Sequence, residues 1–290
     1  MITMEKDKIM KRINLILTLF LSVLILSCSK DDNIQNSGLE ISQEIKDLIY
    51  FKGDENSSTV IINTQGGPIP ELARTELDEI LENVNTTNLL TVNVHQAQTL
   101  KPSLFTSNEI TFNQAIDYDA ESIETLYDVV KYFKDQGRTV YVLGISFGAF
   151  MTQELINKKG LNVADKYLIM VGRLDMNEVF WQGFSEGKTG GFINGISPVL
   201  EEQTDITDKN MSKLAAGLGQ NRYTELFKTL DLSNITYVYG KTDQQVGKLT
   251  DSEVQFLQSK GANIIAGNGD HSDTIDDYIV QGFKEAFGIE

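Results

Sequence analysis

Cysteine, histidine and proline are scarce in this sequence of 290 residues, which contains one, two and four of them respectively. A single cysteine cannot form an internal disulfide, and it excludes a zinc site built mainly from thiolates. The two histidines, His95 and His271, do not stand at the spacing of a metal-binding pair, and no phosphate-cradling glycine loop is present. We therefore expect neither a metal nor an organic cofactor.

Basic residues are also few, because 25 lysines and arginines face 41 acidic residues and leave a net charge of −16. A phosphate backbone is bound by clustered lysine and arginine, so this balance argues against a nucleic-acid partner. The apolar fraction of 41 % is enough for a sizeable core. We expect one large domain with an acidic, well-solvated surface.

The longest apolar run lies near the N-terminus, between Ile13 and Leu26, and directly follows the basic stretch 6–12. A run of about 14 residues is too short to cross a hydrocarbon core of ~30 Å as a helix. Its length and its basic flank are typical of a secretory signal peptide. We therefore predict that residues 1–27 form a signal peptide.

The only cysteine, Cys28, closes this segment in the sequence Ile-Leu-Ser-Cys, which resembles the bacterial lipobox. The resemblance implies acylation of Cys28 and attachment to the membrane, with 28–43 as a flexible polar tether. Ser29 after the cysteine favours the outer membrane, and the following Lys-Asp-Asp resembles an export tag of surface lipoproteins. An uncleaved anchor remains the alternative.

From residue 44 to residue 290, short β-branched runs alternate with helical patterns, as in an α/β fold with a mainly parallel sheet. The apolar runs are continuous, which is typical of strands covered by helices on both faces. Leu48–Phe51 is a candidate edge strand. The clearest predicted strands are Thr59–Thr64, Leu90–Val94, Thr139–Gly144, Lys166–Val171, Ile235–Tyr239 and Asn263–Ala266.

Three helices can be bounded from their end signals. The pattern predicts one helix over 120–136 with Asp119 as its N-cap, and another that opens with a Thr250–Glu253 capping box and stops near Gly261. The last helix is expected from about residue 274 onward.

Residues 176–233 lie between two predicted strands but are too many for one crossover helix. We interpret this segment as a cap inserted over the mouth of a site, and an ordinary helical excursion on the sheet is the alternative. Phe180, Trp181 and Phe184 in its first half are candidates for an apolar acyl pocket, although the core of a cap has the same composition.

Three glycine-containing motifs follow predicted strands, and each ends at or contains a residue type that is common in catalytic sites. Gly144-Ile145-Ser146-Phe147-Gly148 matches G-x-S-x-G between a strand and a helix, the setting that exposes a serine nucleophile on a strained turn. A Gly-Lys-Thr-Asp turn ends at Asp243, and a Gly-Asn-Gly-Asp-His turn ends at His271. Together the motifs resemble the α/β-hydrolase superfamily over roughly residues 45–288.

The resemblance implies a role for each of these side chains. Ser146 would be the nucleophile, His271 the general base and Asp243 the acid that orients the imidazole. The superfamily order of serine, acid and histidine along the chain excludes His95, which precedes the serine. Asp175, which follows an earlier strand, remains the fallback acid.

A fourth motif, Gln65-Gly66-Gly67-Pro68, resembles the His-Gly-Gly-Pro oxyanion loop of prolyl-aminopeptidase-like members. It implies that the N–H groups of Gly67 and Phe147 hold the oxyanion. Gln65 replaces the usual histidine and Ile69 replaces a further glycine, which places the peptidase subfamily in doubt.

The sequence thus predicts a lipid-anchored serine hydrolase that cleaves an ester or amide bond through an acyl-enzyme, with esters of small or medium acyl groups as the favoured substrates. Two alternatives stay open. One is a surface lipoprotein that kept the fold as a non-catalytic binding module. The other is a peptidase or acyltransferase on the same scaffold.

Overall fold

The structure, a computed structural model, describes residues 40–290. The predicted signal peptide, Cys28 and most of the predicted tether lie outside the described residues, so these remain predictions. Within residues 40–290, no helix is long and apolar enough to cross a membrane.

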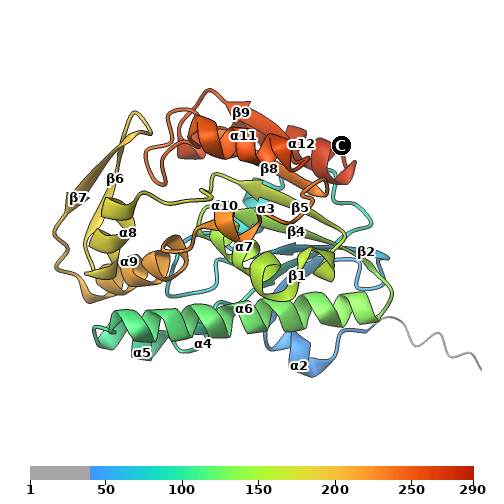
Figure 1. The fold of residues 1–290 in the computed structure, drawn as a ribbon. Coiled ribbons are helices and arrows are strands. Elements are labelled where there is room, and N and C mark those ends of the chain that lie inside the picture. Colours follow the sequence, from blue (N-terminus) through green and yellow to red (C-terminus); the bar gives the residue numbers. More distant parts are fainter. Residues whose placement is uncertain (1–39) are drawn as a thin grey trace, which may run out of the picture. The chain divides into compact units, whose positions relative to one another are not determined.

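The described part of the chain contains a seven-stranded sheet in the order β1-β3-β2-β4-β5-β8-β9 (Figure 1). All neighbouring strands pair in parallel except β1, which runs antiparallel to β3 at one edge. The mainly parallel sheet and its edge strand confirm the sequence prediction. The strands are β1 Ile49–Gly53, β2 Thr59–Asn63, β3 Leu90–Val94, β4 Thr139–Ile145, β5 Lys166–Met170, β8 Ile235–Gly240 and β9 Asn263–Gly267.

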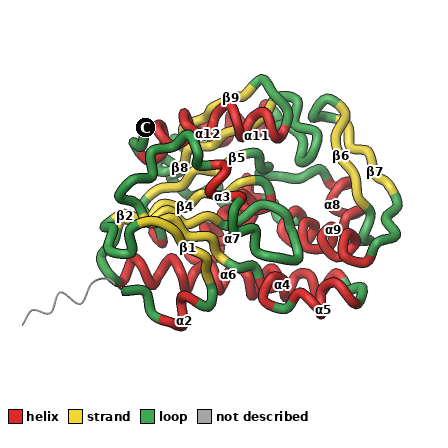
Figure 2. The backbone as a smooth tube through the Cα atoms, turned by 180° about the vertical axis from the view of Figure 1, so that it is seen from behind, coloured by secondary structure: helices red, strands yellow, loops and turns green. Residues whose placement is uncertain are grey.

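Helices cover both faces of this sheet, with α6 on one side and α12 on the other in both views (Figures 1 and 2). The helices outside the 176–233 segment are α2 Gln43–Lys46, α3 Glu76–Ile80, α4 Ala97–Leu100, α5 Pro102–Ser107, α6 Phe112–Asp135, α7 Phe147–Lys159, the 3-10 turn η1 Leu161–Val163, α11 Asp251–Ser259 and α12 His271–Phe287.

The strands are apolar throughout because their residues alternate between two cores. Val60 and Ile62 of β2 belong to the apolar cluster that contains residues of α6 and α7. Ile61, between them, belongs to a second cluster with residues of α3 and α12. Successive side chains of a strand point to opposite faces, so a strand buried on both faces needs an unbroken apolar run.

Two predicted helix starts are wrong. Helix α6 begins at Phe112, because Thr111 and Gln114 form a capping box there, and Asp119 is a buried residue inside the helix rather than its N-cap. Helix α12 begins at His271 with Asp270 as its N-cap, so His271 is the first residue of the helix rather than part of the preceding turn. The Thr250–Glu253 capping box of α11 is confirmed.

The segment 176–233, here called the insert, contains two longer helices and a hairpin. Both views place α8, α9 and the β6–β7 hairpin together at one end of the sheet (Figures 1 and 2). Residues of α8 and α9 line the same cavity as Ser146. The elements of the insert are α8 Glu178–Ser185, β6 Thr189–Ile193, β7 Ser197–Glu201, α9 Ile206–Gly219 and α10 Tyr223–Leu226.

Candidate active site

Ser146 stands between the end of β4 and the start of α7, on the turn that the sequence predicts. Its backbone has φ of 58° and ψ of −118°, a region that residues with side chains rarely adopt. Such strain persists only where the surrounding structure imposes it, and it concentrates at functional sites. The turn leaves Ser146 partly exposed although its neighbours Ile145 and Phe147 are buried.

The two glycines of the motif are required by close backbone contacts. A Cβ on Gly144 would lie 2.5 Å from the carbonyl oxygen of Gly148. A Cβ on Gly148 would lie 2.8 Å from the carbonyl oxygen of Gln65. Both distances are shorter than any side chain tolerates, so the tight turn depends on glycine at both positions.

His271 and Asp243 are brought together by the last two strands of the sheet. Nδ1 of His271 lies 2.7 Å from Oδ2 of Asp243, and both side chains are almost completely buried. Oδ1 of Asp243 accepts hydrogen bonds from the backbone N–H groups of Gln245 and Val246 at 2.8 and 3.0 Å. The carboxylate is therefore held from one side by the backbone and directed toward the imidazole from the other.

Ser146 and His271 line one cavity of about 520 Å³, which also contains Gly66, Gly67 and Gln245. Among residues 40–290, the serine hydroxyl forms no hydrogen bond with the imidazole. In an enzyme without bound substrate the contact between nucleophile and base is often long and tightens only in the substrate complex. The structure thus brings His271 and Asp243 into contact and places Ser146 in the same cavity as His271.

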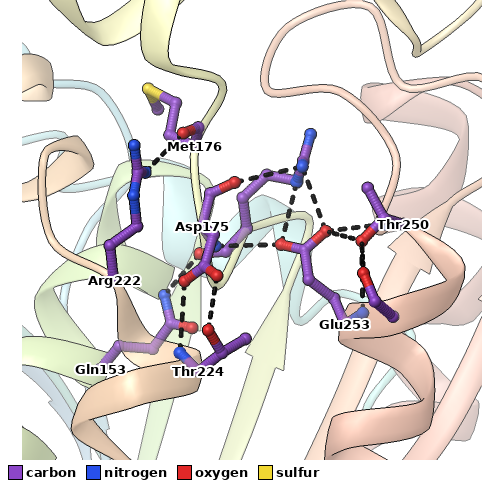
Figure 3. Close-up of polar contacts among 9 residues, drawn as sticks. Gln153, Asp175, Met176, Arg222, Thr224, Thr250 and Glu253 are labelled. Carbon is purple, nitrogen blue, oxygen red and sulfur yellow. Dashed lines mark hydrogen bonds and ion pairs between the residues drawn. The ribbon is translucent and has the colours of Figure 1, made fainter.

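Asp175, the fallback acid, is engaged elsewhere (Figure 3). Its carboxylate accepts hydrogen bonds from the backbone N–H and the hydroxyl of Thr224 at 3.2 and 2.5 Å. It joins the segment after β5 to the start of α10, and no hydrogen bond of the described residues connects it to His271. The geometry favours Asp243 over Asp175 as the partner of the imidazole.

Figure 3 also shows a buried ion pair beside Asp175. The guanidinium of Arg173 donates two hydrogen bonds to the carboxylate of Glu253, at 3.2 and 3.1 Å. The same carboxylate accepts the backbone N–H groups of Asp175 and of Thr250, at 2.9 and 2.7 Å. These bonds tie the chain that enters the insert to the first turn of α11.

His95 does not line the cavity that Ser146 and His271 share. Its Nδ1 lies 2.8 Å from the Thr99 hydroxyl. Burial, together with the nearby Arg74 guanidinium, lowers the pKa of His95, which favours the neutral imidazole. This histidine fits a structural role at the end of β3.

The two predicted oxyanion donors, Gly67 and Phe147, both line a cavity that Ser146 also lines. Within the described residues, neither backbone N–H is used in a hydrogen bond. Phe147 is the first residue of α7, where N–H groups have no partner inside the helix and where the helix dipole favours negative charge. Both N–H groups are thus available to a ligand oxygen.

A network of buried glutamines that the sequence analysis missed holds the 64–69 loop. Nε2 of Gln96 lies 3.3 and 3.2 Å from the carbonyl oxygens of Thr64 and Gln65. Nε2 of Gln98 lies 3.1 Å from the carbonyl oxygen of Ile69. Because these side chains satisfy the loop's carbonyls, the backbone of Gly66 and Gly67 is kept in a defined position.

Two asparagines at the ends of neighbouring strands extend this network. Asn63 of β2 donates to Asn93 of β3, and Asn93 donates to the carbonyl oxygen of Ala73 at 2.7 Å. The backbone N–H of Ala73 in turn donates to the side-chain oxygen of Gln65 at 3.0 Å. Polar residues inside otherwise apolar parallel strands are the signal that would have found it.

A second cavity of about 440 Å³ lies on the insert side of Ser146. Phe180 and Phe184, two of the predicted pocket aromatics, line it, whereas Trp181 is not among its lining residues. The rings of Phe180 and Phe184 are 4.3 Å apart, centre to centre. We call it the apolar cavity. Its other apolar lining residues are Pro68, Phe147, Phe150, Met176, Met211, Ala215 and Val246.

No metal site is apparent in the described part of the chain, where no group of three or more histidine, cysteine, aspartate or glutamate side chains converges. The candidate site consists of a serine, an imidazole paired with a carboxylate, and two backbone donors. This set of groups supports acyl transfer through the protein's own side chains.

No protein-family model and no curated protein sequence match the chain. Several solved structures do match the chain. One, from the metagenome-derived lipolytic enzymes LipS and LipT, superposes with a TM-score of 0.53 at 8 % identity over 83 % of this chain and 96 % of that one. MGS-M2, an α/β-hydrolase enzyme from a deep-sea metagenome library of the Medee basin, has a TM-score of 0.51 at 14 % identity over 83 % and 94 %.

An esterase from Exiguobacterium antarcticum has a TM-score of 0.50 at 10 % identity, over 82 % of this chain and 92 % of that one. This chain has the α/β-hydrolase fold. In the α/β-hydrolase fold the nucleophile occupies the sharp turn from a strand into a helix, and Ser146 stands at that turn. At such low identity the likeness establishes the fold alone.

Proposed function

We propose that this protein is a serine hydrolase that cleaves an ester, with Ser146 as nucleophile, His271 as general base and Asp243 as its orienting acid. The single observation that carries the proposal is the buried 2.7 Å contact between Asp243 and His271, whose other side lines a cavity together with Ser146. The order of the three residues along the chain, serine, acid and histidine, also supports the proposal.

The proposed reaction begins when the hydroxyl oxygen of Ser146 attacks the acyl carbonyl carbon and its proton passes to Nε2 of His271. Asp243 holds the other ring nitrogen as a donor and stabilises the imidazolium. The N–H groups of Gly67 and Phe147 donate to the oxyanion. The imidazolium then protonates the leaving group. In the second half of the reaction His271 takes a proton from water as the water oxygen attacks the acyl carbon, and it returns the proton to the oxygen of Ser146, which releases the acid.

The apolar cavity supports an ester with a small or medium acyl chain as the substrate. Its phenylalanine and methionine side chains offer an apolar wall directly beside Ser146, where burial of each CH₂ contributes about 0.8 kcal/mol. In this proposal the insert acts as a cap that supplies the acyl pocket. The esterase and the lipolytic enzymes that share the fold are consistent with this class of reaction.

An active-site probe tests the proposal directly. A fluorophosphonate should label the native protein, and neither the heat-denatured protein nor Ser146→Ala should be labelled. Labelling that persists in Ser146→Ala would remove Ser146 as the nucleophile. No labelling of the native protein, together with no turnover of p-nitrophenyl esters, would instead favour a binding module without activity.

Substrate preference separates esterase from peptidase. We expect the purified protein to hydrolyse p-nitrophenyl esters of graded chain length and to leave aminoacyl anilides intact. The oxyanion loop supports this expectation, because Gln65 stands where the prolyl-aminopeptidase-like motif has histidine. Turnover of the anilides without turnover of the esters would reverse the assignment.

We further propose that the enzyme is tethered to the outer membrane through acylated Cys28, after removal of residues 1–27. Two or more acyl chains suffice for stable anchoring. Cells fed an alkyne-tagged fatty acid should yield a labelled protein in the outer-membrane fraction, and Cys28→Ser should abolish the label. Retention of the label in Cys28→Ser would contradict the lipidation site.

A further inference from the structure

The two cavities at Ser146 differ in charge as well as in polarity. The larger one, here called the acidic cavity, is lined by the carboxylates of Glu76, Glu79 and Asp276. The apolar cavity contains one charged lining residue, Asp208. Among the described residues that line either cavity there is no lysine and no arginine. The walls around the nucleophile therefore repel anions and attract cations.

Glu76 is the carboxylate in this wall that most clearly lacks a partner. Its Oε2 is buried and has no hydrogen-bond partner among the described residues. Burial, reinforced by the neighbouring carboxylate of Glu79, raises the pKa of Glu76. A buried carboxylate oxygen without a donor is costly, and a cation bound at the same carboxylate, on the side of Oε1, would offset that cost by stabilising its negative charge.

Gly66 lies close to both Glu76 and Ser146. A Cβ added to Gly66 would lie 3.6 Å from Oε1 of Glu76 and 3.9 Å from Cβ of Ser146. Both are ordinary contact distances, so the carboxylate and the serine lie near each other along the cavity that Gly66 also lines. A group bonded to the carbonyl at Ser146 needs only a short linker to reach the carboxylate.

We propose that the acidic cavity binds the leaving group of the substrate and that this leaving group carries a positive charge, as an alkylammonium alcohol does. The proposal rests on the proposed hydrolase function and specifies its substrate class. The acyl chain occupies the apolar cavity, the scissile carbonyl lies at Ser146 and Gly67, which border both cavities, and the ammonium lies beside Glu76.

Glu76 is a specificity-determining residue in this arrangement. An ammonium near a partly buried carboxylate is attracted more strongly than in water, because the effective dielectric constant is lower there. An anionic leaving group is rejected for the same reason. Glu79 and Asp276 add to the negative potential of the cavity from the two helices α3 and α12.

Equilibrium binding tests the inference without requiring turnover. The full-length Ser146→Ala protein is titrated by calorimetry with butyrylcholine and with 3,3-dimethylbutyl butyrate, its neutral isostere in which carbon replaces the charged nitrogen. We expect the cation to bind about tenfold more tightly or better, with a preference that shrinks as salt is added. Equal affinity for the two ligands would overturn the inference.

A matched pair of variants assigns the preference to Glu76. Glu76→Gln, made in the Ser146→Ala protein, should reduce the ratio of the two affinities severalfold. Glu82→Gln removes the same charge from a neighbouring exposed position outside the cavity and should leave the ratio unchanged. An unchanged ratio in Glu76→Gln, or an equal loss in Glu82→Gln, would overturn the assignment.

Turnover by the unmodified protein separates this inference from the function on which it rests. Butyrylthiocholine should have a higher kcat/KM than S-(3,3-dimethylbutyl) thiobutyrate, its neutral isostere, with released thiol as the readout. Hydrolysis of both thioesters at equal rates would refute the cationic leaving group and leave the hydrolase intact. No hydrolysis of either ester, or of p-nitrophenyl butyrate, would refute the hydrolase itself.

Discussion

Replacing Asp243 by asparagine is the most informative single perturbation, because the structure determines how the new amide must orient. Oδ1 of Asp243 accepts two backbone N–H groups, those of Gln245 and Val246. The asparagine oxygen will keep this position, since its NH₂ group cannot accept a hydrogen bond. The NH₂ group will therefore face Nδ1 of His271.

That orientation selects the wrong tautomer of the imidazole. Nδ1 of His271 must then accept a hydrogen bond, so the ring proton moves to Nε2 and this nitrogen can no longer take the proton of Ser146. In a protease with the same relay this substitution lowers kcat ~10⁴-fold. We expect a similar loss here, which corresponds to about 5.5 kcal/mol in the activation free energy.

Steady-state hydrolysis of p-nitrophenyl butyrate and the rate of fluorophosphonate labelling both measure this loss. Asp175→Asn is the matched control, because the carboxylate of Asp175 contacts Thr224 instead of His271. The control should stay within about threefold of the unmodified enzyme, since its site has no part in the proton relay. Activity of Asp243→Asn within tenfold of the unmodified enzyme would refute the proposed relay.

Three further predictions concern stability and the turn. Burial, and to a smaller extent the charge of Glu154, raises the pKa of Asp119 well above its usual value. The contribution of Asp119 to the free energy of unfolding is therefore complete below about pH 4, where the carboxyl is protonated in both the folded and the unfolded chain, and it is lost as pH rises and the buried group must ionise. Asp119→Asn should thus raise Tm increasingly from pH 4 to pH 8, and a pH-independent difference would contradict this. Glu253→Gln should lower the free energy of urea unfolding by about 3 kcal/mol, because Arg173 is left buried without its anion. Gly148→Ala should reduce kcat about 100-fold or more, because its Cβ displaces the oxyanion loop, and unchanged turnover would argue against that contact.

The features predicted well from sequence are those carried by local patterns. Continuous apolar strands predict a doubly covered parallel sheet, and the glycines around Ser146 predict the strained turn that the structure shows. The start of α6 was misjudged for a local reason as well. Asp119 resembles an N-cap by type, but Thr111 with Gln114 caps the helix eight positions earlier.

Other features depend on contacts that no local pattern contains. Asp243 and Asp175 both follow strands, and only the tertiary structure decides that the first meets His271 and the second meets Thr224. The same holds for Gln96, whose amide supports a loop about 30 residues earlier in the chain.

By itself, the sequence determined the fold class and identified Ser146 and His271 as candidates for nucleophile and base, because order along the chain and spacing around glycine are properties of the sequence. Only the tertiary structure decided which carboxylate faces His271 and which aromatic residues of the insert line a cavity with Ser146. It also decided that Glu76 lines the other cavity at Ser146. Hydrogen bonds and cavities are made between residues far apart in the chain, and their geometry exists only once the strands and helices have packed.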